Sequence, residues 1–197
     1  MLYIFFRILL IPLFWLVYRP QITGAQHLRI QGKAIFVCNH ISMMDPIIVA
    51  MISPRLVHFM AKAELFKNPI ANVFFRAFLA FPVNRKQADM ASLKNAMRVL
   101  DQGKVFGIFP EGKRSVTDDL DELEKGAAFL ASRSGAPIVP IYIRPDSYRK
   151  WKLHIAVGKP LSVSDLVATT PKSKLVDVMT DEISDAIRAL RTEMGLT

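Results

Sequence analysis

The segment around His40 combines a histidine and a carboxylate at a spacing that suits general base catalysis. His40 lies five residues before Asp45, which is followed by Pro46. Asp45-Pro46 is typical of a helix N-cap with proline at the first helical position, so we expect His40 in the loop before a helix. Residues five apart diverge on a regular helix but can converge across such a turn. Asp45 would then orient the ring, and its other nitrogen could take a proton from a substrate hydroxyl.

The same segment also has a purely structural interpretation. Asp45 could simply cap the helix while His40 hydrogen-bonds to nearby backbone. Cys38 ends an apolar run and has no obvious activating neighbour, so we expect an inert thiol. The segment alone leaves the catalytic and the structural interpretation open.

A second segment, Val105 to Ser115, resembles a phosphate-binding loop. Gly107 and Gly112-Lys113 have the spacing of a P-loop, but Arg114 stands where that motif places its Mg²⁺-binding serine or threonine. Pro110 also lacks the N–H that a phosphate cradle would use. Nucleotide hydrolysis is therefore not expected. A glycine turn that presents Lys113, Arg114 and backbone amides still suits a phosphate group, although a solvated basic turn would look the same.

These segments need a scaffold, and the hydrophobic pattern predicts an α/β one. Periodic apolar positions predict helices around Met90–Leu100, Leu123–Leu130 and Leu175–Leu190. Apolar and β-branched runs predict strands at Ala34–Cys38, Val57–Ala61, Leu79–Val83, Val105–Phe109, Ile138–Ile143 and Leu153–Val157. The alternation predicts a single layered α/β domain with a mixed, largely parallel sheet flanked by helices. The chemistry should lie at the strand ends.

The N-terminus predicts a membrane-associating helix. Leu2–Tyr18 is almost wholly apolar, but as a helix it would reach only about 25 Å, and Pro12 and Arg7 both oppose a clean span. We expect a kinked helix that lies in the membrane interface, with a buried core helix as the alternative. The chain then divides into a membrane-associating segment, residues 1–20, and a catalytic domain, residues 21–197.

The net charge and the cysteine content limit the binding partners and the cellular location that we expect. Lys and Arg number 26 against 17 Asp and Glu, which favours phosphorylated substrates, anionic headgroups or nucleic acid. One cysteine excludes an internal disulfide and a multi-cysteine zinc site, so the cytoplasmic side of the cell membrane is the simplest location. We expect the C-terminal basic cluster to contact anionic lipid and not nucleic acid; around Tyr148 and Trp151 it comprises Arg144, Arg149, Lys150, Lys152 and Lys159.

From Ala34 to Pro140 the chain resembles the bacterial 1-acylglycerol-3-phosphate acyltransferases of the glycerolipid acyltransferase family. Four blocks agree in order. His40 to Asp45 matches the family's H-x-x-x-x-D motif and Phe109 to Gly112 its F-P-E-G block. The other two blocks are Lys62 to Phe66 with Phe81 to Arg85, and Ile138 to Ile141.

The resemblance implies that His40 is the general base and Asp45 its partner. It places the glycerol-phosphate site at Lys62, Arg85, Glu111, Gly112 and Arg114. Lys113 replaces the family's usual threonine, and as an extra cation it could strengthen phosphate binding or alter acceptor choice. A glycine that the family commonly has before Phe81 is absent.

The implied reaction moves a fatty acyl group from acyl-CoA or acyl-carrier protein to the sn-2 hydroxyl of lysophosphatidic acid, which gives phosphatidic acid without a metal or cofactor. Another lysophospholipid or glycerol-phosphate acceptor, or a non-catalytic anionic-lipid-binding protein, are the alternatives. A serine hydrolase is not expected, because no serine has the G-x-S-x-G setting.

Overall fold

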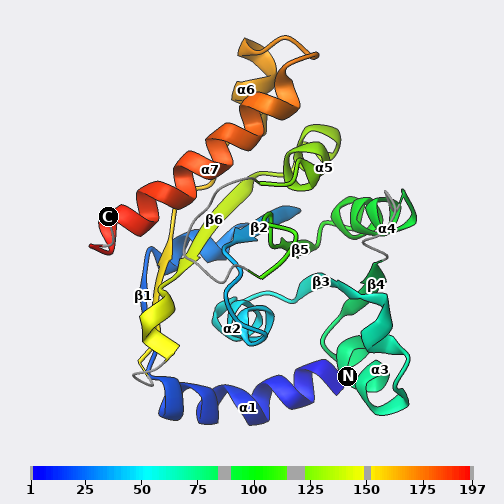
Figure 1. The fold of residues 1–197 in the computed structure, drawn as a ribbon, viewed down its shortest axis with the longest axis vertical. Helices are drawn as coiled ribbons and strands as arrows, with labels where there is room; N and C mark the ends of the chain where they lie inside the picture. Colours follow the sequence, from blue (N-terminus) through cyan, green and yellow to red (C-terminus); the bar gives the residue numbers. More distant parts are fainter. Residues whose placement is uncertain (1, 84–89, 115–122, 149–151, 196–197) are drawn as a thin grey trace.

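The computed structural model describes residues 2–83, 90–114, 123–148 and 152–195 and contains one seven-stranded sheet (Figure 1). The strands are β1 (Gln21–Thr23), β2 (Ala34–Cys38), β3 (Val57–Lys62), β4 (Ala80–Val83), β5 (Val105–Ile108), β6 (Ile138–Ile143) and β7 (His154–Val157). Their spatial order is β1-β7-β6-β2-β5-β3-β4. Every neighbouring pair is parallel except β6 and β7. The carboxyl ends of β2, β3, β4, β5 and β6 therefore meet at one edge.

Helices cover both faces of the sheet. The α-helices are α1 (Leu2–Tyr18), α2 (Asp45–Ile52), α3 (Pro69–Ala77), α4 (Met90–Asp101), α5 (Gly126–Ser134), α6 (Val163–Thr169) and α7 (Leu175–Glu193). Within the described ranges, the short 3-10 helices are η1 (Ala25–Arg29), η2 (Ala63–Phe66) and η3 (Pro145–Tyr148). α1, α2 and α3 lie on one side of the sheet, and α4, α5 and α7 lie on the other (Figure 1).

The central strand β2 shows why its sequence is a continuous apolar run. All of its residues are buried, and its side chains alternate between two cores. Phe36 joins the core formed with α1 and α2, while Ile35 and Val37 join the core formed with α4, α5 and α7. A parallel strand covered on both faces needs apolar residues at every position.

The predicted fold class is confirmed. β2 and β6 have the predicted bounds, and the other predicted strands agree to within one residue at each end. The helices expected from the periodic apolar positions are α4, α5 and α7. β1 has no counterpart among the predicted strands, because its short sequence Gln21–Thr23 carries no apolar run.

The N-terminal apolar segment forms α1, which includes Pro12. Phe14 is buried in the core shared with α2, whereas Leu13, Trp15 and Leu16 are exposed. Within the described ranges, no helix combines the length and the apolar character needed to cross a membrane. The kink, the interfacial position and the division at residue 20 stay predictions.

Candidate active site

His40 and Asp45 form a hydrogen-bonded pair where β2 ends and α2 begins. His40 Nδ1 lies 2.8 Å from Asp45 Oδ2. The Asp45 side chain is fully buried, and the His40 side chain keeps 13% of its surface exposed. An ionised carboxylate only accepts hydrogen bonds, so Nδ1 carries the proton and Nε2 has a free lone pair. The expected convergence of these two residues is therefore present.

The Asp45 carboxylate is turned toward the loop before the helix. Its Oδ2 also accepts the backbone N–H groups of Ile41, at 2.7 Å, and Ser42, at 2.8 Å. The predicted N-cap role is wrong: Asp45 is the first residue of α2, and Met44 holds the N-cap position without a side-chain cap bond. Asp45 Oδ2 accepts its hydrogen bonds from the loop backbone and from the imidazole, and not from the first N–H groups of the helix. This loop fixes the carboxylate that orients His40.

The Phe109–Gly112 turn after β5 forms a second support for His40. Glu111 Oε1 accepts the His40 backbone N–H at 2.8 Å, and Glu111 is only 8% exposed. The Phe109 ring stacks on the imidazole with ring centres 4.3 Å apart. Gly112 adopts a φ of 65°, which few residues other than glycine tolerate. The turn thus brings Glu111 and Gly112, both predicted to bind substrate, next to the histidine loop.

Gly107, which the P-loop comparison singled out, has a different role. It lies inside β5, beside Phe36 of β2 and Phe59 of β3. A Cβ at this position would lie 2.2 Å from Cε1 of Phe59. The glycine therefore makes room for an aromatic ring in the core and does not form part of a phosphate cradle.

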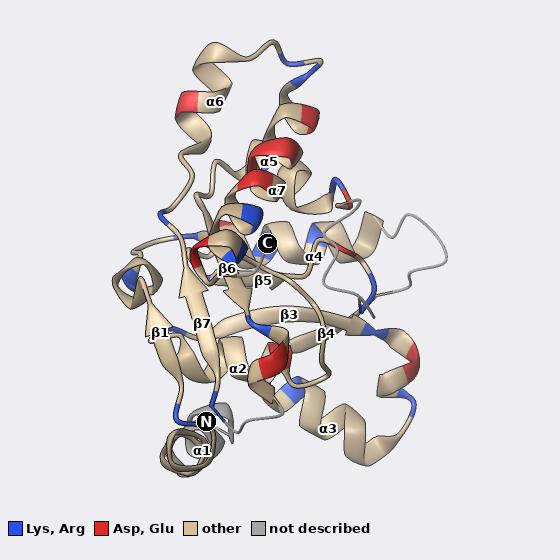
Figure 2. Ribbon diagram, turned by 60° about the vertical axis from the view of Figure 1, so that its left-hand side comes forward, with Lys and Arg blue, Asp and Glu red and all other residues tan. Residues whose placement is uncertain are grey.

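The basic residues predicted to bind phosphate differ in what the structure shows of them. Lys62 is exposed at the end of β3 and lies 3.6 Å from Glu64 (Nζ to Oε1). Lys113 and Arg114 are exposed directly after Gly112. Arg85 lies outside the described residues, as do Arg149, Lys150 and Trp151 of the C-terminal basic cluster. Figure 2 shows basic and acidic segments just after β3. β2 and β5 run parallel to β3 in the sheet, so they end at the same edge.

Two residues of this site were not predicted from the sequence. The Asn39 amide exchanges hydrogen bonds with the backbone of Ile143 (2.9 and 2.8 Å), which ties the start of the His40 loop to β6. The Tyr148 hydroxyl donates to Asp45 Oδ1. Burial, together with the negative charge of Asp45, raises the pKa of Tyr148 far above its ordinary value. Both contacts join residues more than 100 positions apart, so local spacing carries no signal for them.

The buried Cys38 has an environment that disfavours its thiolate. Burial raises the pKa of Cys38 well above its ordinary value, and the charges of Asp45 and Glu111 act in the same direction. A neutral thiol is a poor nucleophile. The expected inertness of Cys38 agrees with this setting.

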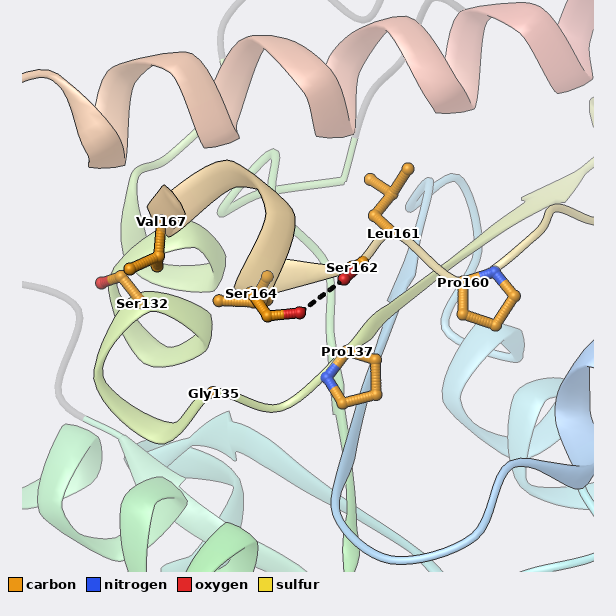
Figure 3. Close-up of a pocket in the computed structure, with 9 residues that line it drawn as sticks. Ser132, Gly135, Pro137, Pro160, Leu161, Ser162, Ser164 and Val167 are labelled. Carbon is orange, nitrogen blue, oxygen red and sulfur yellow. Dashed lines mark hydrogen bonds between the residues drawn. The ribbon is translucent and has the colours of Figure 1, made fainter. Parts of the chain in front are cut away.

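Two cavities differ in their relation to the histidine. A groove of about 320 Å³ between α1, α2 and α3 is lined almost entirely by apolar atoms, and Met44, the residue before Asp45, is part of it. A pocket of about 340 Å³ between α5 and α6 lies near the start of β6, and none of its lining residues is an acid or a base (Figure 3). Its Ser162 and Ser164 hydroxyls hydrogen-bond to each other at 2.9 Å (Figure 3). Of these two cavities, the groove beside Met44 is the one that adjoins the His40 loop.

A histidine oriented by a buried carboxylate, at the carboxyl edge of an α/β sheet, defines a site that can activate a hydroxyl group. The Acyltransferase family model matches residues 19–144, which include His40, Asp45 and Glu111. This chain belongs to that acyltransferase family. Tyr148 lies beyond the matched segment.

Known relatives agree with this assignment. The chain is 31% identical over 180 residues to the 1-acyl-sn-glycerol-3-phosphate acyltransferase of Bacillus subtilis, covering 88% of this chain and 89% of the relative. It is 28% identical to the enzyme of that name from Streptococcus pneumoniae, covering 84% and 65%. The crystal structure of the 1-acyl-sn-glycerophosphate acyltransferase from Thermotoga maritima has the same fold, with a TM-score of 0.69 and 21% identity over 94% of this chain and 81% of that one.

Proposed function

We propose that the chain transfers a fatty acyl group from an activated acyl donor to the sn-2 hydroxyl of 1-acylglycerol-3-phosphate, and so forms phosphatidic acid. The observation that carries the proposal is the His40–Asp45 pair, in which the 2.8 Å contact at Nδ1 leaves Nε2 free to act as a base. The names of the Bacillus and Streptococcus relatives support the choice of acceptor. Acyl-CoA and acyl-carrier protein are the two donors that we propose.

In the proposed reaction His40 Nε2 takes the proton of the acceptor hydroxyl as its oxygen attacks the thioester carbonyl carbon of the donor. The tetrahedral intermediate then expels the donor thiolate, which receives the proton from the imidazolium. Asp45 holds the ring in the required tautomer and stabilises its positive form. A positioned base contributes about 10²–10⁴-fold. The scheme needs neither an enzyme nucleophile nor a metal or organic cofactor.

We propose that cations at the edge of the sheet bind the acceptor phosphate. Lys113 and Arg114 follow Gly112, whose turn adjoins the histidine loop, and Lys62 ends the neighbouring strand β3. Arg85 is included by its resemblance alone. An arginine can hold a phosphate through two parallel hydrogen bonds, while a lysine acts as a point charge. Anchoring the phosphate would fix the distance between the hydroxyl and His40, which lowers the entropic cost of the reaction.

We propose that the apolar groove between α1, α2 and α3 receives an acyl chain, and that α1 rests in the membrane interface on the cytoplasmic side. Leu16 is 70% exposed and Trp15 45% exposed, whereas the preceding residue, Phe14, is buried in the core. Large apolar residues exposed side by side on a helix suit a lipid surface. Acidic residues of α7 lie on the opposite side of the sheet (Figure 2), so an anionic membrane would favour contact through the α1 side. We expect no nucleic-acid partner.

A transfer assay tests the proposal. The full-length protein in lipid vesicles is given 1-acylglycerol-3-phosphate and either acyl-CoA or acyl-carrier protein, and mass spectrometry identifies the lipid product. Phosphatidic acid should form, and His40→Ala should lower kcat by about 10²-fold or more. His27→Gln is the matched control, because His27 contacts Val157 (Nδ1 to O, 3.1 Å) and not the dyad. Undiminished turnover by His40→Ala, or no product from the wild type with either donor, would contradict the proposal.

A further inference from the structure

We propose that Tyr148 is a positioning residue for catalysis. Its hydroxyl donates a hydrogen bond to Oδ1 of Asp45 and so keeps the carboxylate aligned with His40. The inference rests on the proposed acyl transfer. Tyr148 is not expected to touch substrate. It would act through Asp45 on the direction and the charge of the contact between Asp45 and the imidazole.

The first argument is the division of hydrogen bonds between the two carboxylate oxygens. Oδ2 accepts from His40, Ile41 and Ser42. Among the described residues, Tyr148 is the donor to Oδ1. The Asp45 side chain is fully buried, so water could not take the place of a missing donor without a rearrangement. A buried ionised carboxylate that loses a donor is destabilised and can lower its energy by turning about its Cβ–Cγ bond.

The second argument is that hydrogen bonds and an ion pair hold the turn that places Tyr148 beside Asp45. Asn39 ties the end of β6 to the residue before His40 through both the N–H and the C=O of Ile143. The η3 turn that follows is closed by an ion pair between Arg144 and Asp146, with Nε 2.6 Å from Oδ1. The Ser147 backbone N–H donates to the Arg144 carbonyl at 3.2 Å. The hydroxyl of Tyr148 is thus held against Asp45 from the strand that neighbours β2.

The titratable groups around His40 in the described structure come from four elements. Asp45 begins α2, Glu111 follows β5, Cys38 ends β2 and Tyr148 ends η3. Cys38 and Tyr148 are both disfavoured as anions by burial, which raises the pKa of each. The negative charges beside the histidine therefore reside on Asp45 and Glu111. Tyr148 disperses the charge of Asp45 at Oδ1, as the backbone N–H groups of Ile41 and Ser42 do at Oδ2, without adding a charge of its own.

Two consequences separate this role from simple packing. Without the hydroxyl, the carboxylate is held less firmly, so the distance and direction of its contact with the imidazole should change. The ring orientation should also loosen, which slows the proton transfer while leaving substrate binding unchanged.

The experiment compares Tyr148→Phe with the wild type and with Tyr142→Phe. The Phe variant keeps the ring and removes the hydroxyl. Tyr142 is buried in β6 within the core on the other face of the sheet, so its variant reports the effect of losing a buried hydroxyl away from the dyad. The assays measure kcat and KM for the lipid acceptor and for the donor. The proton NMR spectrum is recorded as well, because an imidazole N–H bonded to a buried carboxylate gives a distinct downfield signal, assigned by its loss in His40→Gln.

Tyr148→Phe should lower kcat by about tenfold and leave both KM values within about twofold. The downfield His40 signal should shift or broaden. Tyr142→Phe should show none of these changes, even if it melts at a lower temperature. A Tyr148→Phe protein with the wild-type kcat and downfield signal, or one changed only in melting temperature, would overturn the inference. A wild-type protein without transfer activity would instead refute the proposed function, and the NMR comparison would still test the contact.

Discussion

Gly107 offers a sharp test of how the core positions the histidine. Its missing side chain leaves room for Phe59, which is 4% exposed. Phe59 stacks against Phe109 with ring centres 6.1 Å apart, and Phe109 stacks on His40 at 4.3 Å. Gly107→Ala would place a methyl group against the first ring of this series. The strain should therefore reach the imidazole through two aromatic contacts.

The size of the effect follows from the distances. The added Cβ would lie 2.2, 2.8 and 3.0 Å from three atoms of the Phe59 ring. Since carbon atoms in contact lie about 3.5 Å apart or more, the ring must retreat by roughly 1.3 Å. Overpacking of this kind costs about 1–3 kcal/mol, and replacing a strand glycine by alanine returns about 0.5–1 kcal/mol. A net loss of about 1–2 kcal/mol corresponds to a melting temperature lower by about 2–8 °C.

The assay pairs thermal unfolding with acyl transfer. Gly107→Ala should melt earlier and lose about tenfold in kcat, because a shift of about 1 Å near reacting groups is enough to misalign them. Gly126→Ala is the matched control, since a Cβ there would meet only Ile108 Cδ1 at 3.8 Å. Phe59→Leu removes the clashing ring atoms and should be less harmful when combined with Gly107→Ala than additivity predicts. Wild-type stability and turnover in Gly107→Ala, or strict additivity in the double variant, would refute the reasoning.

Two further predictions concern the membrane and pH. Leu16→Glu should weaken binding to anionic phospholipid vesicles about tenfold or more in co-sedimentation, because a large apolar side chain contributes about 1.5–3 kcal/mol on burial. The control is Val167→Glu, at a residue on α6 that is 47% exposed. Equal losses of binding in the two variants would count against α1 as the helix that contacts lipid. Burial lowers the pKa of His58 from its ordinary value of 6.5, so below that pH the unfolded chain binds more protons and the free energy of unfolding falls as pH decreases. Denaturant titrations of His58→Gln should show a shallower fall below pH 6.5, and an unchanged slope would contradict this assignment.

The scaffold was predictable wherever burial leaves a pattern in the sequence. β2 and β6 are buried at every position, and both were delimited to the residue from their apolar runs. The periodic apolar positions of α7, such as Met179, Ile183 and Ile187, coincide with its buried face. Parallel strands then bring their carboxyl ends together without further information. The strand geometry predicted that the chemistry lies at the strand ends, and the family resemblance assigned Glu111 to the same site as His40.

Local sequence patterns could not predict contacts between residues on different strands of the sheet. β1 is recognised only by its pairing with β7, since Gln21 and Thr23 are exposed. The contact of Asp45 with His40 was among the expectations, but the N-cap role was wrong, because the folded loop offers the carboxylate more donors than the helix end does. Tyr148 was assigned to a basic surface cluster, and its contact with Asp45 depends on β6 lying beside β2.

The balance of hydrogen bonds at Asp45 indicates why the site depends on the assembled sheet. The loop between β2 and α2 supplies three donors to Oδ2, including the histidine itself. Burying the carboxylate completely also requires a donor to Oδ1, and that donor is Tyr148, from the turn after β6. An unpaired buried charge is costly, so the loop alone would keep Asp45 in contact with water and leave the imidazole less firmly held. The hydrogen bonds of Asp45 therefore draw on residues that follow both β2 and β6. This explains why the H-x-x-x-x-D spacing is suggestive by itself and becomes a defined site only in the folded domain.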